Sequence, residues 1–441
     1  MEVDTGLERI IPSANIKTII NPSLPSLKQL MEVDGSIDHR KKVFIYPEPS
    51  DISNLGPIDF VIHETPGYYL DLSSVIVDVK LRLLNDNGNR DSIADWKSYF
   101  INNLSQTLWS TVKVSLNNTN IESNYYNQQL ANLQHILSTP NIIVRERGTI
   151  QGAFEIEPTT ISETVSAELI ASPSIVERIS FAKQEVVHLT APLQLDLSSA
   201  TKYLFDGINM KITLEPSSPT FLIKRTNVEG VTRINHKYTI DSIRLLITKV
   251  KPSDGVLISE AKRLINKPFE YVIRRNLVKD TVFPVGHSEL TISRPFQSVV
   301  PNKLYVFMVK QTGARGSYHQ HPFFYGPNNL QSYSVKLDGL EISGHETTAG
   351  FVQTYFESLQ AHGEDYFIPY SLFKHSCFVI CVDTNQGSSL NTLAVERRGN
   401  LQLSLHLSEP LAESLLVYVV GVVDSTFEID TNKSVTTLYQ Y

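Results

Sequence analysis

The most constraining feature of this chain is a series of short segments in which apolar and polar residues alternate. In residues 75–83, Val or Leu occupies every second position, and mostly charged residues lie between them. Residues 401–407 alternate Leu with Gln, Ser and His in the same way. Side chains of a strand point alternately to its two faces, so each segment predicts a strand with one buried face. Because Pro and Gly separate these segments, we expect antiparallel sheets joined by turns.

Similar segments recur along the chain after residue 40. They begin near residues 42, 57, 68, 74, 111, 186, 208 and 238, and then near 269, 288, 303, 333, 377, 401 and 415. The motif LQLxL occurs at 193–197 and again at 401–405, each time ahead of strongly apolar segments that end one half of the chain. This order indicates an internal repeat. A chain of 441 residues is also too long for one ordinary core, so two β-sandwiches in tandem are predicted.

Three segments have the spacing of amphipathic helices instead. Apolar residues at steps of three and four predict helices over 92–109 and 122–138, inside the first sandwich. A third helix is predicted over 258–266, between the two halves. On this basis the chain divides into an N-terminal arm at 1–40, a first sandwich with a helical insertion at 41–252, a linker helix at 253–267 and a second sandwich at 268–441.

The composition argues against several classes of function. The longest uninterrupted apolar run, residues 415–423, is far shorter than the about 20 residues of a membrane-spanning helix. The N-terminal residues lack the basic-then-apolar pattern of a secretory signal, so secretion is not expected. The formal net charge is −7 and no basic cluster occurs, so direct binding to nucleic acid is not expected either.

No catalytic arrangement is detectable in the sequence. On a strand, Cys377 and Cys381 would lie about 13 Å apart, which exceeds the roughly 7 Å that a disulfide spans, so buried reduced thiols are predicted. His319 and His321 form a His-x-His pair, but no acidic residue that could complete a metal site lies between positions 317 and 336. Motifs for phosphate binding and for activated nucleophiles are also missing. We predict no catalytic, cofactor-binding or metal-binding residue, and no cofactor.

Five stretches of the chain together resemble one protein family. They are PIDFVIHETPGYYLDLSSVIVDVKLRL, FINNLSQTLWSTVKVSLNN, IRLLITKVKPSDGVLISEAKRLI with YVIRR just after, GSYHQHPFFYGPNNLQSYSVKLDG, and RRGNLQLSLHLSEPLAESLLVYVVGVVDSTFEIDTNKSVTTLYQY at the end. In order and spacing they are similar to the double jelly-roll major capsid proteins of Polinton/Maverick elements and adintoviruses. The resemblance runs from about residue 58 to the C-terminus, and the ending is its most specific part. Residues before 41 and around 145–175 match poorly.

This resemblance implies a mainly β fold of two tandem eight-stranded antiparallel jelly-roll sandwiches with short helical insertions. It also implies a structural, non-enzymatic major capsid protein, whose pseudo-hexameric homotrimers tile an icosahedral shell around double-stranded DNA. The implied partners are neighbouring capsomers, penton proteins and minor capsid proteins. The implied location is the virion, made inside the host cell, with the DNA enclosed but not clearly bound by this chain.

Two alternatives remain open on the sequence. The same sandwiches could form a receptor- or glycan-binding protein, for which exposed aromatic clusters are expected. They could also form a metal-dependent jelly-roll enzyme, in which His319 and His321 would bind the metal. Residues 145–175 and 311–330 are irregular and are our candidates for outward-facing loops. The arm at 1–40 is a candidate for contacts on the inner face of a shell.

Overall fold

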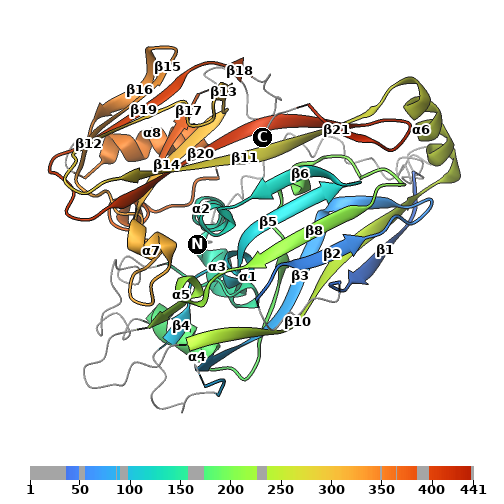
Figure 1. Cartoon of the computed structure of the whole chain (residues 1–441), viewed down its shortest axis with the longest axis horizontal. Coiled ribbons are helices and arrows are strands. Elements are labelled where there is room, and N and C mark those ends of the chain that lie inside the picture. The colour runs from blue at the N-terminus through green and yellow to red at the C-terminus, as the bar shows by residue number, and fades with distance from the viewer. Residues whose placement is uncertain are drawn as a thin grey trace, which may run out of the picture.

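The computed structural model describes residues 36–48, 55–85, 87–89, 98–156, 173–225, 236–347, 350–363, 365–384 and 397–438. In these ranges the chain is mainly β, and its strands form two sandwiches that lie one above the other in Figure 1. Helix α6 (Asp254–Asn266) connects them at one end of the molecule, on the right in Figure 1. None of the helices in the described ranges is long and apolar enough to cross a bilayer.

The first sandwich consists of two four-stranded antiparallel sheets. One sheet has the order β1 (Ile37–Ile45), β10 (His236–Pro252), β3 (Tyr69–Asn85) and β7 (Val187–Pro192). The other has the order β2 (Ile58–Ile62), β8 (Met210–Pro216), β5 (Trp109–Leu116) and β6 (Thr119–Asn124). Val75, Val77 and Val79 of β3 are all buried, so the alternation predicted for residues 75–83 is confirmed.

The second sandwich is built in the same way. One sheet has the order β11 (Phe269–Phe283), β20 (Leu415–Ile429), β14 (Lys303–Lys310) and β17 (Ile380–Asp383), and β21 (Val435–Thr437) pairs with β20. The other has the order β12 (Glu289–Ser293), β19 (Leu401–Leu407), β15 (Leu330–Leu337) and β16 (Leu340–Glu346). Two short pairs complete the described strands, β4 (Ser98–Phe100) with β9 (Ile223–Arg225) and β13 (Val299–Val300) with β18 (Arg397–Arg398).

Both sandwiches repeat one strand order. If β21 is set aside and the other eight strands of the two large sheets in each half are numbered along the chain, both halves contain one sheet in the order 1-8-3-6 and one in the order 2-7-4-5. This is the order of a jelly roll, and the predicted fold of two tandem jelly rolls is confirmed. The LQLxL correspondence is wrong, because residues 401–405 lie in β19 whereas 193–197 follow β7 and enter the 3-10 helix η6 (Asp196–Ser199). The repeat is one of topology, not of that motif.

Helices interrupt the first half more than the second, as predicted. The helices are α1 (Leu104–Thr107), α2 (Asn127–Ser138), α3 (Asn141–Arg147), the 3-10 helix η4 (Gly148–Gln151), α4 (Pro173–Ala182), α5 (Pro219–Leu222), α7 (Gln311–Arg315), α8 (Val352–His362) and α9 (Tyr370–Phe373), besides α6 and η6. Helix α2 confirms the prediction over 122–138, except that β6 occupies its first residues. Helix α6 confirms the prediction over 258–266 and begins earlier.

The long helix predicted over 92–109 is wrong for the residues described there. Residues 98–100 form strand β4, only one helical turn follows in α1, and β5 begins at Trp109. Every residue from 98 to 109 is buried. Helical spacing of apolar residues indicates a helix only where one face is buried and the other is exposed. In a segment that is buried on all sides, apolar residues can occur at this spacing without forming a helix.

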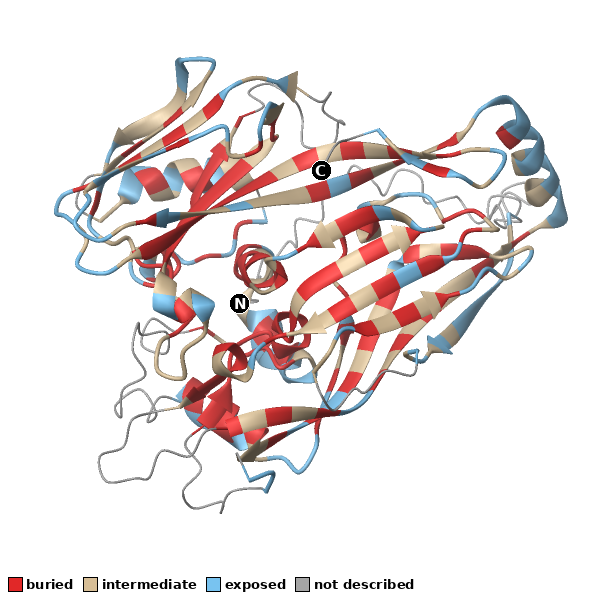
Figure 2. Ribbon diagram, in the orientation of Figure 1, coloured by how far each residue is buried: buried red, intermediate tan, exposed pale blue. Residues whose placement is uncertain are grey.

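Strands β14 and β20 are buried on both faces where the two jelly rolls meet (Figure 2). Residues 304–309 and 415–421 are buried at every position. One face of β20 belongs to the core of the second sandwich. On the other, the ring of Tyr418 lies 5.8 Å from that of Tyr126 in the first half. A strand covered on both faces requires apolar residues throughout, and this explains the uninterrupted run at 415–423.

The domain boundaries at 40, 252 and 267 stay predictions. Strand β1 begins at Ile37, inside the segment assigned to the arm, and residues 1–35 lie outside the described residues. Within the irregular segment at 145–175, residues 157–172 also lie outside them. The described remainder of that segment is mostly helical, in α3, η4 and α4.

Candidate functional site

The His-x-His pair lies at the junction of the two jelly rolls. His321 is buried, and its Nδ1 accepts the backbone N–H of Phe323 at 3.1 Å. The proton of the neutral ring therefore lies on Nε2, which has no hydrogen-bond partner among the described residues. Burial holds the pKa of His321 well below its ordinary value, and the nearby charge of Arg178 lowers it further. The Nδ1 of His319 instead lies 3.3 Å from the carbonyl oxygen of Arg225.

This geometry corrects the expectation that residues 311–330 face outward for residues 321–326, whereas most of residues 311–320 are exposed or half-buried. His321, Phe323 and Tyr325 are all buried, because the segment packs between the halves. In the described ranges, no group of three or more His, Cys, Asp and Glu side chains could hold a metal ion. Of the two histidines, His321 is packed inside the junction, whereas His319 is half-buried.

The cysteines are buried and free, as predicted. Burial raises the pKa of the Cys377 and Cys381 thiols to about 12 in each case. The thiolate is the form that attacks electrophiles and binds metals. Both thiols are therefore protonated and unreactive near neutral pH.

The centre of the junction is a hydrogen-bonded contact between Tyr325 of the second half and helix α2 of the first. The Tyr325 hydroxyl donates to Oε1 of Gln129 at 3.0 Å and accepts from Nδ2 of Asn132 at 2.8 Å. The Gln129 amide also donates to the carbonyl oxygen of Pro322 at 3.1 Å. The Tyr325 ring packs against Phe307 of β14, with 4.4 Å between ring centroids. Buried polar groups with matched partners favour one relative position of the two halves.

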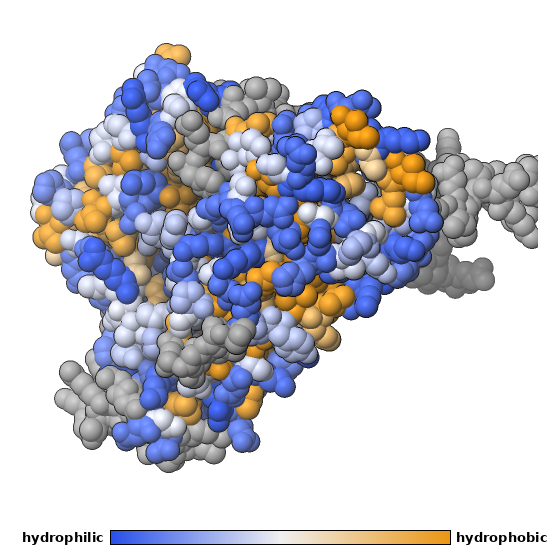
Figure 3. Space-filling view, turned by 45° about the vertical axis from the view of Figure 1, so that its right-hand side comes forward, coloured by the Kyte–Doolittle hydropathy of each residue, from blue (hydrophilic) through white to orange (hydrophobic). Residues whose placement is uncertain are grey.

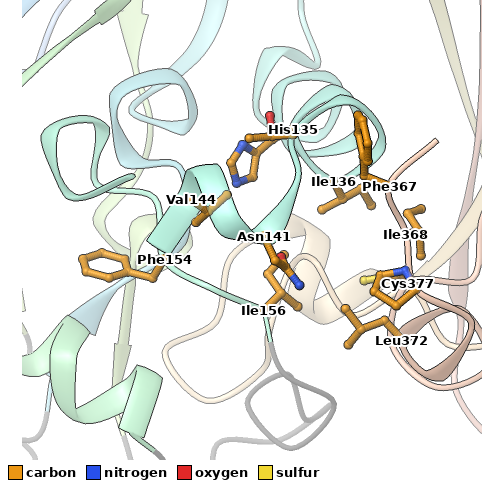
Figure 4. Close-up of a pocket in the computed structure, with 12 residues that line it drawn as sticks. His135, Ile136, Asn141, Val144, Phe154, Ile156, Phe367, Ile368, Leu372 and Cys377 are labelled. Carbon is orange, nitrogen blue, oxygen red and sulfur yellow. The ribbon is translucent and has the colours of Figure 1, made fainter. Parts of the chain in front are cut away.

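A small cavity lies between α2, α3 and residues 367–377, with a volume of about 10 Å³. Figure 4 shows its mostly apolar lining, to which Phe154 and Ile156 contribute from the first half and Leu372 and Cys377 from the second. Such a volume holds about one water molecule. The cavity is therefore too small for an organic substrate.

A second contact between the halves uses the carboxyl groups of Asp196, which is half-buried, and of Glu122, which is buried. Asp196, in η6, accepts from the backbone N–H of Asn276 in β11 at 3.1 Å and from its side-chain amide at 2.6 Å. Glu122 is buried beside it and accepts from the backbone N–H of Leu197 at 3.3 Å. Burial raises the pKa of Asp196 to about 6. Burial, and then the charge of Asp196, raise the pKa of Glu122, while the charge of Arg275 opposes both shifts.

Asp196 gives this contact a pH dependence of known sign. Because its folded-state pKa is raised from 3.8 to about 6, its contribution to stability is fully present below pH 4 and is lost as the pH rises through 6. We expect the unfolding temperature of the wild type, relative to the Asp196→Asn variant, to fall over this range and then level off. Thermal unfolding of both proteins at a series of pH values measures this difference.

The matched control for this pH series is Glu185→Gln, which removes an exposed carboxylate of the same half. The difference in unfolding temperature between Glu185→Gln and the wild type is expected to change little with pH. A wild-type advantage over Asp196→Asn that stays constant or grows between pH 4 and pH 6 would contradict the raised pKa of Asp196.

Helix α8 exposes a stripe of apolar side chains. Its buried residues are Thr354 and Ser358, while Val352, Phe356 and Leu359 are 58%, 57% and 37% exposed. The inward face combines hydroxyl groups with the ring of Tyr355, which lies 5.1 Å from that of Phe373. The Ser358 hydroxyl accepts the backbone N–H of Cys381 at 3.1 Å. Cys381 belongs to β17, the edge strand of its sheet, so α8 covers an edge that would otherwise present free N–H groups. The outward stripe at i, i+4 and i+7 is the pattern of a helix that packs against a partner.

Further apolar side chains are exposed on the helical insertion and at the α6 end. They are Ile142, Ile143, Ile150 and Val176 on the insertion, and Ile258 and Ile265 on α6. Figure 3, which brings the α6 end forward, shows hydrophobic patches between larger hydrophilic areas. Single exposed apolar residues are ordinary, but groups of them mark contact surfaces. The described surface thus offers several patches for protein contacts.

No protein-family model matches the chain. In sequence it is 20% identical to the "Uncharacterized protein F54H12.2" of Caenorhabditis elegans. The alignment spans 312 residues, which are 68% of this chain and 70% of that protein. In structure it is similar to a chain of the Sputnik virophage, with a TM-score of 0.61 and 13% identity over 96% of this chain and 94% of that one. The mavirus major capsid protein gives a TM-score of 0.54 and 13% identity over 96% of each chain. The faustovirus major capsid protein gives a TM-score of 0.54 and 10% identity over 88% of this chain and 90% of that chain.

At these identities the structural likeness establishes the fold. The described residues form a double jelly roll, and the structural similarity extends over 96% of the chain. Sequence reasoning missed the outward face of α8, although the spacing of Val352, Phe356 and Leu359 carried a signal for it. It also missed α4, which follows the irregular segment.

Proposed function

We propose that this protein is a structural major capsid protein. The observation that supports this most strongly is the extent of the likeness to the mavirus major capsid protein, which spans 96% of both chains. Two jelly rolls with short helical insertions make up most of the described residues of this chain. A protein that builds a wall needs rigid, well-packed sandwiches and contact surfaces, and the described residues provide both.

The finer features of the proposal come from the sequence resemblance of residues 58–441. The capsid would be of the Polinton/Maverick or adintovirus type, with homotrimers tiling an icosahedral shell around double-stranded DNA in the virion. Three chains with two jelly rolls each present six similar units, which would give the trimer a pseudo-hexameric outline. Penton and minor capsid proteins would complete the shell, and the arm at 1–40 would contact its inner side. No catalytic role is included.

The test of this proposal is the solution mass of the purified full-length chain by light scattering, with negative-stain images of the same fraction. We expect a mass three times the 49.6 kDa of the chain and particles of triangular or six-lobed outline. A monomer at every concentration, together with specific binding in a glycan screen, would favour the receptor- or glycan-binding alternative. A monomer without glycan binding would count against both functions.

A further inference from the structure

A row of apolar side chains crosses the outer face of one sheet of the first jelly roll. Phe44 of β1 pairs in register with Leu246 of β10, Leu246 pairs with Ile76 of β3, and Ile76 pairs with Pro192 of β7. Leu246, Ile76 and Pro192 each stand between two buried residues, so the row faces away from the core. Phe44 is 44% exposed, Pro192 is exposed, and the other two are half-buried. These four residues form one continuous apolar strip, which we call the Phe44 row.

The second jelly roll has a corresponding row, and there it is covered. Asp280 of β11, Tyr418 of β20 and Phe307 of β14 pair across strands 1, 8 and 3 of the second roll. The first three residues of the Phe44 row lie on strands 1, 8 and 3 of the first roll. Tyr126, directly before α2, covers the second row, since its ring lies 5.8 Å from that of Tyr418 and its hydroxyl donates to Asp280 at 2.7 Å. Within one chain, the start of α2 therefore docks on this face of the second roll.

Helix α8 occupies the place in the second roll that α2 occupies in the first. Each helix follows strand 5 of its roll and precedes strand 6. Helix α2 lies between the two rolls in Figure 1, and eight of its 12 residues are buried. Only two of the 11 residues of α8 are buried, and its stripe of Val352, Phe356 and Leu359 is exposed. Each roll thus has such a helix and such a face, but the α8 stripe and the Phe44 row are both left exposed.

The two exposed surfaces cannot meet within one chain. Figure 1 places α8 and β1 on opposite sides of the junction between the rolls. We propose that the Phe44 row receives the α8 stripe of a second copy of this chain. This inference rests on the proposed function, because it names the two surfaces that hold the trimer together. The contact between chains then repeats the junction within the chain, with the helix after strand 5 docked on the face of strands 1, 8 and 3.

The composition and the symmetry of the two surfaces fit this contact. The Arg244 guanidinium lies 4.1 Å from the Phe44 ring centroid, and aromatic and arginine side chains are enriched at the centres of protein interfaces. The stripe and the row are different surfaces, so the contact is heterologous and every copy offers one of each. Such contacts form a ring when the rotation closes. Three copies then close a ring of six jelly rolls in which junctions within chains and between chains alternate.

The first experiment is cross-linking of the full-length protein with a bismaleimide. Lys42 lies beside the Phe44 row on β1 and Gln360 lies beside the stripe on α8, and both are exposed. We expect the double variant Lys42→Cys, Gln360→Cys to give covalent dimers and trimers on a denaturing gel. The native Cys377 and Cys381 are buried and add no background. Each single variant has a new cysteine on one of the two surfaces alone, and it is expected to stay uncross-linked.

The second experiment tests the receiving surface by light scattering. Phe44→Glu is expected to lower the mass from three times 49.6 kDa to that of one chain, because a charge without a partner would be buried at each contact. The matched control is Ile265→Glu, which places the same charge at an apolar residue of α6 that is 71% exposed. This control is expected to remain a trimer.

The outcomes separate this contact from the proposed function. A double variant that is trimeric in light scattering but forms no covalent species would overturn the assignment of the two surfaces and leave the capsid proposal standing. A folded Phe44→Glu protein that is still a trimer would do the same. A wild type that is monomeric at every concentration would count against both. The cross-linking result decides if Phe44→Glu does not fold.

Discussion

Replacing Tyr325 by Ala is expected to lower the free energy of unfolding by about 5 kcal/mol. The loss of a buried aromatic ring that packs on Phe307 accounts for most of this. The amides of Gln129 and Asn132 also lose their shared partner while they stay buried. Because Tyr325 connects the second jelly roll with α2 of the first, we expect the two halves to unfold less cooperatively. Urea unfolding followed by fluorescence and by circular dichroism measures both effects.

Two variants separate the ring from the hydroxyl in this experiment. Tyr325→Phe keeps the ring and removes the hydroxyl, and its cost is expected to be about 1–3 kcal/mol. Tyr125→Ala removes an exposed tyrosine that precedes α2 and is expected to cost less than about 1 kcal/mol. If Tyr325→Ala lowered the free energy of unfolding as little as Tyr125→Ala, contacts other than those of Tyr325 would have to hold the junction together.

The sequence predicted the elements that have one buried and one exposed face. The alternation in β3 and β19 identified strands because their inward positions are buried and apolar. Their outward positions are less buried and mostly carry polar side chains. Strand β20 was predicted from its uninterrupted run of apolar residues. That run is apolar on both faces because the other half of the chain contacts the strand. The jelly-roll assignment came from the resemblance to a family, since alternation alone does not specify strand order.

The failures fall where burial depends on segments far away in the chain. Residues 98–109 are covered from every side, so their spacing predicted a helix that is absent. His321 was expected in an exposed loop because the segment around it is rich in Gly and Pro, yet its side chain is buried. The neighbouring Tyr318 donates to the carbonyl oxygen of His236 in the other jelly roll. Arg178 looked like one charged residue among 39 Lys and Arg. Its burial without a hydrogen-bond partner among the described residues follows from tertiary packing, and local sequence contains no signal for it.

A capsid role requires surfaces that hold copies together, and α8 offers the most specific one. In the capsid proposal, its exposed stripe of Val352, Phe356 and Leu359 packs against a second copy of the chain. Phe356→Glu is then expected to convert the trimer into monomers, because the new charge would be buried at each of the contacts. The cost should be about 2 kcal/mol or more at each contact. Light scattering of the purified variant measures the change in mass.

The matched control is Gln360→Glu, which adds the same charge at another exposed position of the same helix. It keeps Phe356 in place and is expected to remain trimeric. Circular dichroism should show both variants folded, since both positions are exposed and the hydroxyl that bonds the β17 edge belongs to Ser358. A folded Phe356→Glu protein that is still a trimer would exclude α8 from the trimer contact. The loss of the trimer in Phe356→Glu alone would instead explain why a helix buries hydroxyl groups and exposes a phenylalanine, because the apolar face is then buried in the assembly.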